Sequence, residues 1–262
     1  MKWIFKIIGV LFIILIVWIF GKKILPDNVS KKNIFPLPTP STPSSPLVIP
    51  KIEFNGKNYA YIYFTVSTSE RIMLIPNFSE KLTSQDLATR YGCIEGINGG
   101  FYDTNNTPLG GFMTNNNVFK NPVHNRLIDG FIWENKNGFS ITVSEPPSDA
   151  LFFLQTGPLL RIDGGVTTIS IGNDEYRRRS IAGITKNNSL VFFMIYNPES
   201  VYEGPLLSDV PSIMESIDQK ESLNLDAAVN LDGGSASAFI SKNKTLQEFS
   251  PIGSFFCVMG NP

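Results

Sequence analysis

Short runs of β-branched and aromatic residues, separated by glycine, proline and polar turn residues, dominate the chain after its first fifty positions. Such runs are typical of strands that lie at least partly in a core. We predict strands at 59–66, 131–133, 139–143, 189–195 and 255–259. The pattern therefore indicates a strand-rich domain.

Two segments have helical spacing instead. The first has Thr83 or Ser84 as its N-terminal cap and ends at Gly92, a residue type that commonly ends helices. The second opens at Ser208, and its three- and four-residue spacing gives one apolar face, made by Ile213, Met214 and Ile217. Each helix precedes a short apolar run that we predict to be a strand. We therefore expect a single α+β domain with mixed, strand-rich sheets and a few helices.

The first fifty residues differ from the rest of the chain. Between Trp3 and Phe20 the only charged residue is Lys6, so residues 1–24 are predicted to be a membrane segment. A cleaved signal peptide is the alternative. We favour an uncleaved anchor, because the small residues of a cleavage site are missing after Phe20. Residues 25–50 are rich in Pro, Ser and Thr, which favours an extended stalk, and residues 51–262 form the predicted domain.

The net charge argues against nucleic acid as a partner, and the small number of Cys and His residues argues against a closed zinc site. A formal net charge of −1 and a pI near 5.9 leave no excess of Lys and Arg to neutralise nucleic-acid phosphates. Two cysteines and one histidine cannot complete the usual closed zinc ligand sets without carboxylates. For Cys93 and Cys257, a disulfide and two free buried thiols both stay open.

Two glycine-rich turns are the best candidates for a site. The segments 97–103 (INGGFYD) and 229–237 (VNLDGGSAS) each follow an apolar run, so each places polar groups at the end of a predicted strand. Two consecutive glycines let a ligand approach the main chain, and their amides can converge on an oxyanion or a phosphate. Asn-Gly and Asp-Gly are also common in hairpins, so either turn alone could be an ordinary one.

Four motifs occur in a specific order along the chain. They are 98–110 (NGGFYD, then PLG), 155–160 (QTGPLL), 179–184 (RSIAGI) and 230–237 (NLDGGSAS). In this order they resemble the phosphodiester glycosidase family, whose bacterial members are mostly surface or secreted proteins, and the resemblance covers residues 51–262. The last motif departs from the usual Asp-Gly-Gly-Gly-Ser or Asp-Gly-Gly-Ser-Ser, because Ser235-Ala236-Ser237 follows the two glycines here.

The resemblance implies hydrolysis of a sugar 1-phosphodiester. A phosphate monoester is a good leaving group, so a strong general acid matters less than in ordinary glycoside hydrolysis. Such a site still needs a carboxylate, as nucleophile or base, and donors that hold the phosphate. Asp232 is the expected carboxylate, and Arg179 is the expected phosphate anchor, because a guanidinium matches two phosphate oxygens. Asn98 and Asn230 are expected to bind sugar hydroxyls or an N-acetyl group. Asp103 is a second catalytic candidate that could instead cap a turn.

The remaining expected substrate-binding residues come from the same motifs: Gly99, Gly100, Gln155, Gly157, Gly233, Gly234 and Ser235. His124, the only histidine, follows the first motif and either borders the cleft or is an ordinary loop residue. Participation of a divalent cation beside Asp232 stays open. The expected partners are a phosphorylated glycan or cell-envelope polymer and, through residues 1–24, the membrane. The family resemblance places the domain on the extracytoplasmic side, or outside the cell if the segment is cleaved.

A function of another class also fits these residues. A noncatalytic protein that binds cell-wall material or exopolysaccharide would use the same cleft, with Asn, Asp and aromatic residues such as Tyr102 and Trp133 holding the glycan. Turnover distinguishes it from the enzyme. A nucleotide-binding domain is excluded, because neither pair of glycines belongs to a G-x-G-x-x-G turn that opens a helix in a βαβ unit.

Overall fold

The computed structural model describes residues 48–105, 107–200 and 202–260. These residues lie in one compact unit of the chain. The predicted membrane segment, and the predicted stalk up to residue 47, lie outside the described residues. Within the described ranges, no helix has the length and apolar character needed to cross a membrane.

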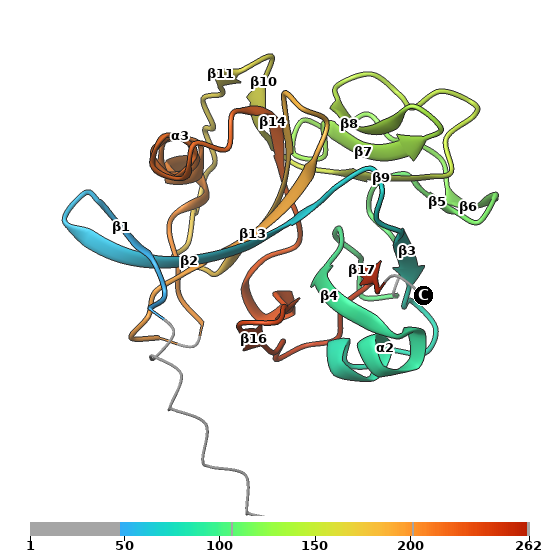
Figure 1. Cartoon of the computed structure of the whole chain (residues 1–262), viewed down its shortest axis with the longest axis horizontal. Helices are drawn as coiled ribbons and strands as arrows, with labels where there is room; N and C mark the ends of the chain where they lie inside the picture. Colours follow the sequence, from blue (N-terminus) through green and yellow to red (C-terminus); the bar gives the residue numbers. More distant parts are fainter. Residues whose placement is uncertain (1–47, 106, 201, 261–262) are drawn as a thin grey trace, which may run out of the picture. The chain divides into compact units, whose positions relative to one another are not determined.

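The largest sheet has seven strands, in the order β1-β2-β13-β12-β14-β10-β11 (Figure 1). In that order the strands are Lys51–Phe54, Lys57–Val66, Leu190–Tyr196, Arg179–Thr185, Leu225–Asn230, Leu159–Ile162 and Gly165–Val166. Every residue of β12 and β13 is buried. Both faces of the sheet are therefore covered at these two strands.

Two further sheets have five strands each. One has the order β16-β15-β4-β17-β3, and its strands are Thr245–Leu246, Phe239–Ile240, Cys93–Asn98, Ser254–Met259 and Ile72–Pro76. The other has the order β6-β5-β9-β7-β8, with strands Asn117–Lys120, Phe112–Thr114, Phe152–Thr156, Gly130–Asn135 and Gly138–Thr142.

The expectation of strand-rich sheets with few helices is confirmed, and each of the five predicted strands overlaps β2, β7, β8, β13 or β17. The expectation of mixed sheets is wrong. All ladders between the named strands of the described residues are antiparallel. Tight connections such as the turn between β7 and β8 bring neighbouring strands back in the opposite direction, whereas parallel pairs need long crossovers.

The first helix, α2 (Ser84–Tyr91), has the predicted ends. The side chain of Thr83 accepts a hydrogen bond from the amide of Asp86 at 3.1 Å, and Gly92 closes the helix with a φ of 69°. Leu87 and Ala88 pack on one side against residues of β3 and β17. This helix lies beside β4 and β17 in Figure 1.

The second helix, α3 (Val210–Glu221), begins two residues later than predicted, after a 3₁₀ turn at Leu207–Asp209. Ser208 is not its cap. The carboxylate of Asp174 accepts hydrogen bonds from the amides of Leu207 at 2.9 Å and Ser208 at 2.8 Å, so a distant side chain holds this turn. Pro211 then sits in the first helical turn, where a missing amide hydrogen costs little.

Alternation along the strands of the large sheet produces two core layers. On one face, Val191, Phe193 and Ile195 pack against α3. On the other face, Phe192, Met194 and Tyr196 join the core that the large sheet shares with strands of the two smaller sheets. The large sheet is thus sandwiched, which explains why its strands carry continuous apolar runs.

The cysteines form a disulfide between Cys93, the first residue of β4, and Cys257 in β17. This result decides between the two alternatives that the sequence left open. The bond joins two strands that already pair directly. It therefore ties down the strand that ends in the first glycine-rich turn.

Candidate active site

A pocket of about 380 Å³ lies at the end of β14, where the chain passes through the second glycine-rich turn. Six of the residues expected from the sequence line it: Arg179, Asn230, Asp232, Gly233, Gly234 and Ser235. Three further lining residues were not anticipated, and these are Phe101, Arg177 and Leu207. Residues from four distant parts of the chain therefore converge on one cavity.

Asp232 is fixed through its main chain by the first glycine-rich turn. Its amide donates to the carbonyl of Gly99 at 3.0 Å, and its carbonyl accepts from Nδ2 of Asn98 at 2.6 Å. Burial raises the pKa of the Asp232 carboxyl from 3.8 to about 7, and the amide of Gly233 acts in the opposite direction. At neutral pH the side chain is therefore present in both its protonated and its ionised form, as acid–base catalysis requires.

Arg179, the first residue of β12, is held firmly in the wall of the pocket. Nε donates to the carbonyl of Pro205 at 3.0 Å, and Nη2 donates to the carbonyl of Glu175 at 2.5 Å and contacts Asp174 at 3.4 Å. Burial lowers the pKa of the guanidinium to about 10, which leaves it charged at neutral pH. Nη1 makes no hydrogen bond to the described residues, so it is the nitrogen left for a ligand.

Arg177 supplies a second cation to the same pocket. It lies two residues before Arg179 and shares its side of the chain, whereas Arg178 between them lines a different cavity. The Arg177 side chain is half exposed and is bound by Glu175 at 2.7 Å. The alternation of an extended segment could have identified Arg177 together with Arg179 from the sequence.

Asn230, the last residue of β14, has one polar atom without a partner. Nδ2 donates to the carbonyls of Gly157 at 3.1 Å and Leu231 at 2.7 Å. Oδ1 is buried and accepts no hydrogen bond from the described residues. A buried acceptor without a partner is costly, so this atom is available for a hydroxyl or amide group of a ligand.

Asn98, in contrast, has its polar atoms engaged within the protein. Oδ1 accepts from the hydroxyl of Ser180 at 2.7 Å and from the amide of Ala238 at 3.0 Å, while Nδ2 binds Asp232. The side chain does not line the pocket. The location of Asn98 favours a role in positioning Asp232 and not a contact with the sugar.

The glycines serve close packing more than anion binding. The amide of Gly99 donates to Ser254 at 2.8 Å, and the amide of Gly234 donates to Arg178 at 2.9 Å, so neither is free for a phosphate. A Cβ atom on Gly99 would lie 2.1 Å from the hydroxyl of Ser254. Gly234 has a φ of 63°, which glycine adopts without strain.

Besides Asn98 and Gly99, the expected site residues Asp103, His124, Gln155 and Gly157 lie outside the pocket that Asp232 lines. The Asp103 carboxylate accepts hydrogen bonds from the amides of Asn105 at 2.9 Å and Thr107 at 2.8 Å. Asp103 therefore caps a turn, which was the alternative to a catalytic role. Gln155 binds four main-chain groups, contributed by Gly111, Val123 and Ile128. Together with His124 it lines a separate cavity of about 540 Å³. The carbonyl of Gly157 supports Asn230 from behind.

Gly100 is likewise absent from the lining of the pocket, although its neighbour Phe101 contributes. A Cβ atom on Gly100 would lie 2.9 Å from Leu154. The described residues contain no group of three or more His, Cys, Asp or Glu side chains that could hold a metal ion. Asp232 is the one carboxylate among the residues that line the pocket.

These features agree with comparisons of the whole chain. A family profile described as phosphodiester glycosidase matches residues 91–259. That span is more than half of the 262 residues, so the chain belongs to the phosphodiester glycosidase family. A search of curated proteins finds no match.

Two solved structures are similar to the chain. One is the zebrafish N-acetylglucosamine-1-phosphodiester alpha-N-acetylglucosaminidase catalytic domain, auto-inhibited by its pro-peptide, with a TM-score of 0.63, 15% identity and coverage of 82% of both chains. The other is a hypothetical protein from Synechocystis, with a TM-score of 0.61, 14% identity and coverage of 80% of this chain and 61% of that one. At such identities the similarity supports the fold.

Proposed function

We propose that this protein hydrolyses a sugar 1-phosphodiester and that the pocket lined by Asp232 is its active site. The observation that carries the proposal is the convergence of one carboxylate of raised pKa and two guanidinium groups on a single pocket, in a member of the phosphodiester glycosidase family. The carboxylate suits chemistry at the sugar carbon, and the guanidinium groups suit a phosphate.

The presence of a single carboxylate fits the chemistry of a phosphodiester better than that of an ordinary glycoside. Ordinary glycosidases use one carboxyl group to protonate the departing oxygen and a second as nucleophile or base. Here the bond between the anomeric carbon and oxygen breaks, and the electron pair leaves with a phosphate monoester that needs little protonation. Asp232 can then act as nucleophile, or as base towards water, while Arg177 and Arg179 hold the phosphate.

The hydrogen bonds of Arg179 modify the expected bidentate clamp. Two of its three nitrogens are already bound to Pro205, Glu175 and Asp174, so Nη1 alone faces the ligand. Arg177 is half exposed and donates from Nε and Nη2 to Glu175, so a phosphate bound by both arginines would receive one contact from Nη1 of each, and more from Arg177 only if it releases Glu175. Arg177→Gln should accordingly weaken substrate binding without disturbing the core.

We also propose that the protein acts outside the cytoplasm as a single-pass anchored protein. The apolar segment at residues 3–20 motivates the anchor, and the disulfide between Cys93 and Cys257 supports an oxidising compartment. Mass spectrometry of the mature N-terminus tests this proposal. A chain that starts after Gly21 would contradict the anchor and would indicate a secreted protein.

The activity is tested by incubating the full chain, purified in detergent, with a small panel of sugar 1-phosphodiesters, with and without a chelator. Release of free sugar by the parent protein, lost in Asp232→Asn, supports the proposal. Glu134→Gln is the matched control, because burial also raises the pKa of Glu134 to about 7 but Glu134 does not line the pocket. Binding of the glycans without any turnover would favour the noncatalytic glycan-binding protein instead.

A further inference from the structure

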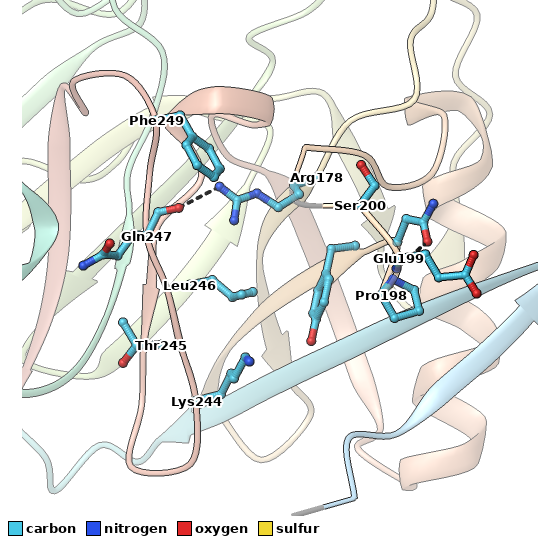
Figure 2. A pocket seen from close by; sticks show the side chains of 11 residues that line it. Arg178, Pro198, Glu199, Ser200, Lys244, Thr245, Leu246, Gln247 and Phe249 are labelled. Atoms are coloured by element: carbon cyan, nitrogen blue, oxygen red, sulfur yellow. Dashed lines mark hydrogen bonds between the residues drawn. The ribbon is translucent and has the colours of Figure 1, made fainter.

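A second and larger cavity, of about 580 Å³, lies between the segment 196–200 and the segment 244–249. Figure 2 shows Arg178 between these two segments, with Pro198, Glu199 and Ser200 on one side and Lys244 to Gln247 on the other. We call this cavity the Arg178 pocket. None of its residues was assigned to the site lined by Asp232.

Arg178 is a buried cation without a carboxylate partner. Arg178 is only 2% exposed. Nη2 donates to the carbonyls of Ser237 at 3.0 Å and Gln247 at 2.8 Å, and Nε is buried with no partner among the described residues. Within that same part of the chain, no Asp or Glu oxygen lies within 4.0 Å of the guanidinium. A buried charge in this condition is stabilised by any anion that reaches it.

The rest of the pocket has the composition of a saccharide site. Lys244 adds a second cation, and Glu199, the single carboxylate of the lining, is exposed. The ring of Phe249 lies over the Arg178 guanidinium at 5.1 Å and is itself 51% exposed. It packs against the ring of Tyr202, which is 49% exposed, with 4.6 Å between centroids and the ring planes tilted by 46°. Exposed aromatic faces beside a few polar groups favour ligands with both an apolar face and hydroxyl groups.

We propose that the Arg178 pocket is a second binding site, for an anionic saccharide whose charged group lies between Arg178 and Lys244 and whose ring lies against Phe249. Phosphate and carboxylate share the chemistry that these two cations recognise. A phosphorylated saccharide is the ligand we expect, which rests on the proposed function, whereas a uronic acid is the other source of the same charge.

The Arg178 pocket is built on the same backbone as the proposed active site. Arg178 and Arg179 are consecutive, and their side chains line the two different cavities. The carbonyl of Arg178 accepts from Gly234, and the carbonyl of Ser235 accepts from the amides of Phe249 at 2.7 Å and Ser250 at 3.1 Å. The two cavities therefore share their main-chain support, although they have no lining residue in common.

Two phenylalanines provide separate reporters, because Phe249 lines the Arg178 pocket and Phe101 lines the pocket with Asp232. The full chain is labelled with 4-fluorophenylalanine, the two signals are assigned with Phe249→Leu and Phe101→Leu, and the protein is titrated with glucose 1-phosphate, glucuronic acid and glucose. The Phe249 signal should shift saturably with an anionic sugar. Lys244→Gln should raise the midpoint of that shift roughly tenfold, as expected for the loss of one charged contact, and leave the Phe101 midpoint unchanged.

Lys242→Gln is the matched control, because Lys242 is exposed on the same turn but does not line the pocket. If the midpoint for glucose 1-phosphate is lower than that for glucuronic acid, the site prefers phosphate; if it is higher, the site prefers a carboxylate. Both results support the proposal. The proposal is overturned if the Phe249 signal does not shift, or if it shifts equally with uncharged glucose. It is also overturned if Lys244→Gln and Lys242→Gln change the midpoint of the shift equally. Binding at Phe249 in a protein without hydrolytic activity would support this site while contradicting the proposed function.

Discussion

The two glycine-rich turns are alike in sequence and differ in the structure. In the first turn, Asn98 has its polar side-chain atoms bound within the protein, and Gly99 uses its amide to bind Ser254. In the second turn, Asn230 keeps a buried oxygen without a partner, and Asp232 faces a pocket with a pKa raised to about 7. Similar residues therefore support the fold in one turn and line a pocket with unsatisfied polar groups in the other. The difference lies in which polar groups the fold leaves unsatisfied.

The largest effect should come from Asp232→Asn. The substitution keeps the shape of the side chain and removes the charge that stabilises an oxocarbenium-like transition state, so kcat should fall by about three orders of magnitude with little change in KM. Steady-state kinetics measures both constants, and thermal melting must show that the variant is folded. A folded variant with most of its turnover would remove Asp232 from the mechanism.

Activity should also depend on the ionisation of Asp232. If the carboxylate is nucleophile or base, kcat/KM should fall about tenfold per pH unit below the pKa of about 7 and level off above it. Rates measured from pH 5 to pH 9 with a neutral-sugar phosphodiester check this. A profile that instead falls as pH rises through 7 would show that the protonated form is the active one.

Asn98→Ala should lower the free energy of unfolding by about 3 kcal/mol. The reason is that the substitution leaves the amide of Ala238, the carbonyl of Asp232 and the hydroxyl of Ser180 without their partner in a buried place. Urea denaturation measures the loss. A variant as stable as the parent, with a raised KM instead, would show that Asn98 contacts the substrate after all and would break the comparison between the two turns.

Asn230→Ala should act on binding, because Asn230 lines the pocket and its buried Oδ1 has no partner among the described residues. We expect KM to rise about tenfold, in line with one lost hydrogen bond, and the free energy of unfolding to fall by about 1–2 kcal/mol through the lost contacts to Gly157 and Leu231. Kinetics and urea denaturation separate the two effects. An unchanged KM would assign Asn230 to the same supporting role as Asn98.

The pKa of Asp232 also affects stability, with a definite sign. The folded state holds the proton up to about pH 7, whereas the unfolded chain releases it near the ordinary value of 3.8. The stabilisation is therefore complete below about pH 4 and is lost as pH rises to 7. Asp232→Asn lacks this dependence, so its free energy of unfolding should gain about 4 kcal/mol on that of the parent between pH 4 and pH 8, since each unit of pKa shift corresponds to about 1.4 kcal/mol. A constant difference across this range would show that the carboxyl has an ordinary pKa.

The smallest effect should come from Asp103→Asn. Asn retains the oxygen that accepts from the amides of Asn105 and Thr107, so activity should stay within twofold and the free energy of unfolding within about 0.5 kcal/mol. The same kinetic and denaturation measurements apply. A loss of activity greater than tenfold in a folded protein would return Asp103 to the list of catalytic residues.

Local patterns in the sequence determined the strands and the first helix. Phe192, Phe193 and their neighbours have to be buried in any fold, and Thr83 and Gly92 form caps through hydrogen bonds within a few residues. The predicted start of the second helix was less accurate, because the 3₁₀ turn before it is held by Asp174, which is far away in the sequence. Short-range signals predict structure where the deciding contacts are themselves short-range.

The order of four motifs and the place of Asp232 after a predicted strand were available from the residues themselves, and the choice of Arg179 came from the resemblance of those motifs to a known family. Only the tertiary structure separated Asn98 from Asn230, joined Cys93 to Cys257, added Arg177 to the pocket and placed Gln155 and His124 in another cavity. Residue type sets which hydrogen bonds and charges a side chain can offer. Which of them stay free is decided by long-range packing, because burial and the nearest partners come from segments more than a hundred residues apart, as for Asn98 and Asp232.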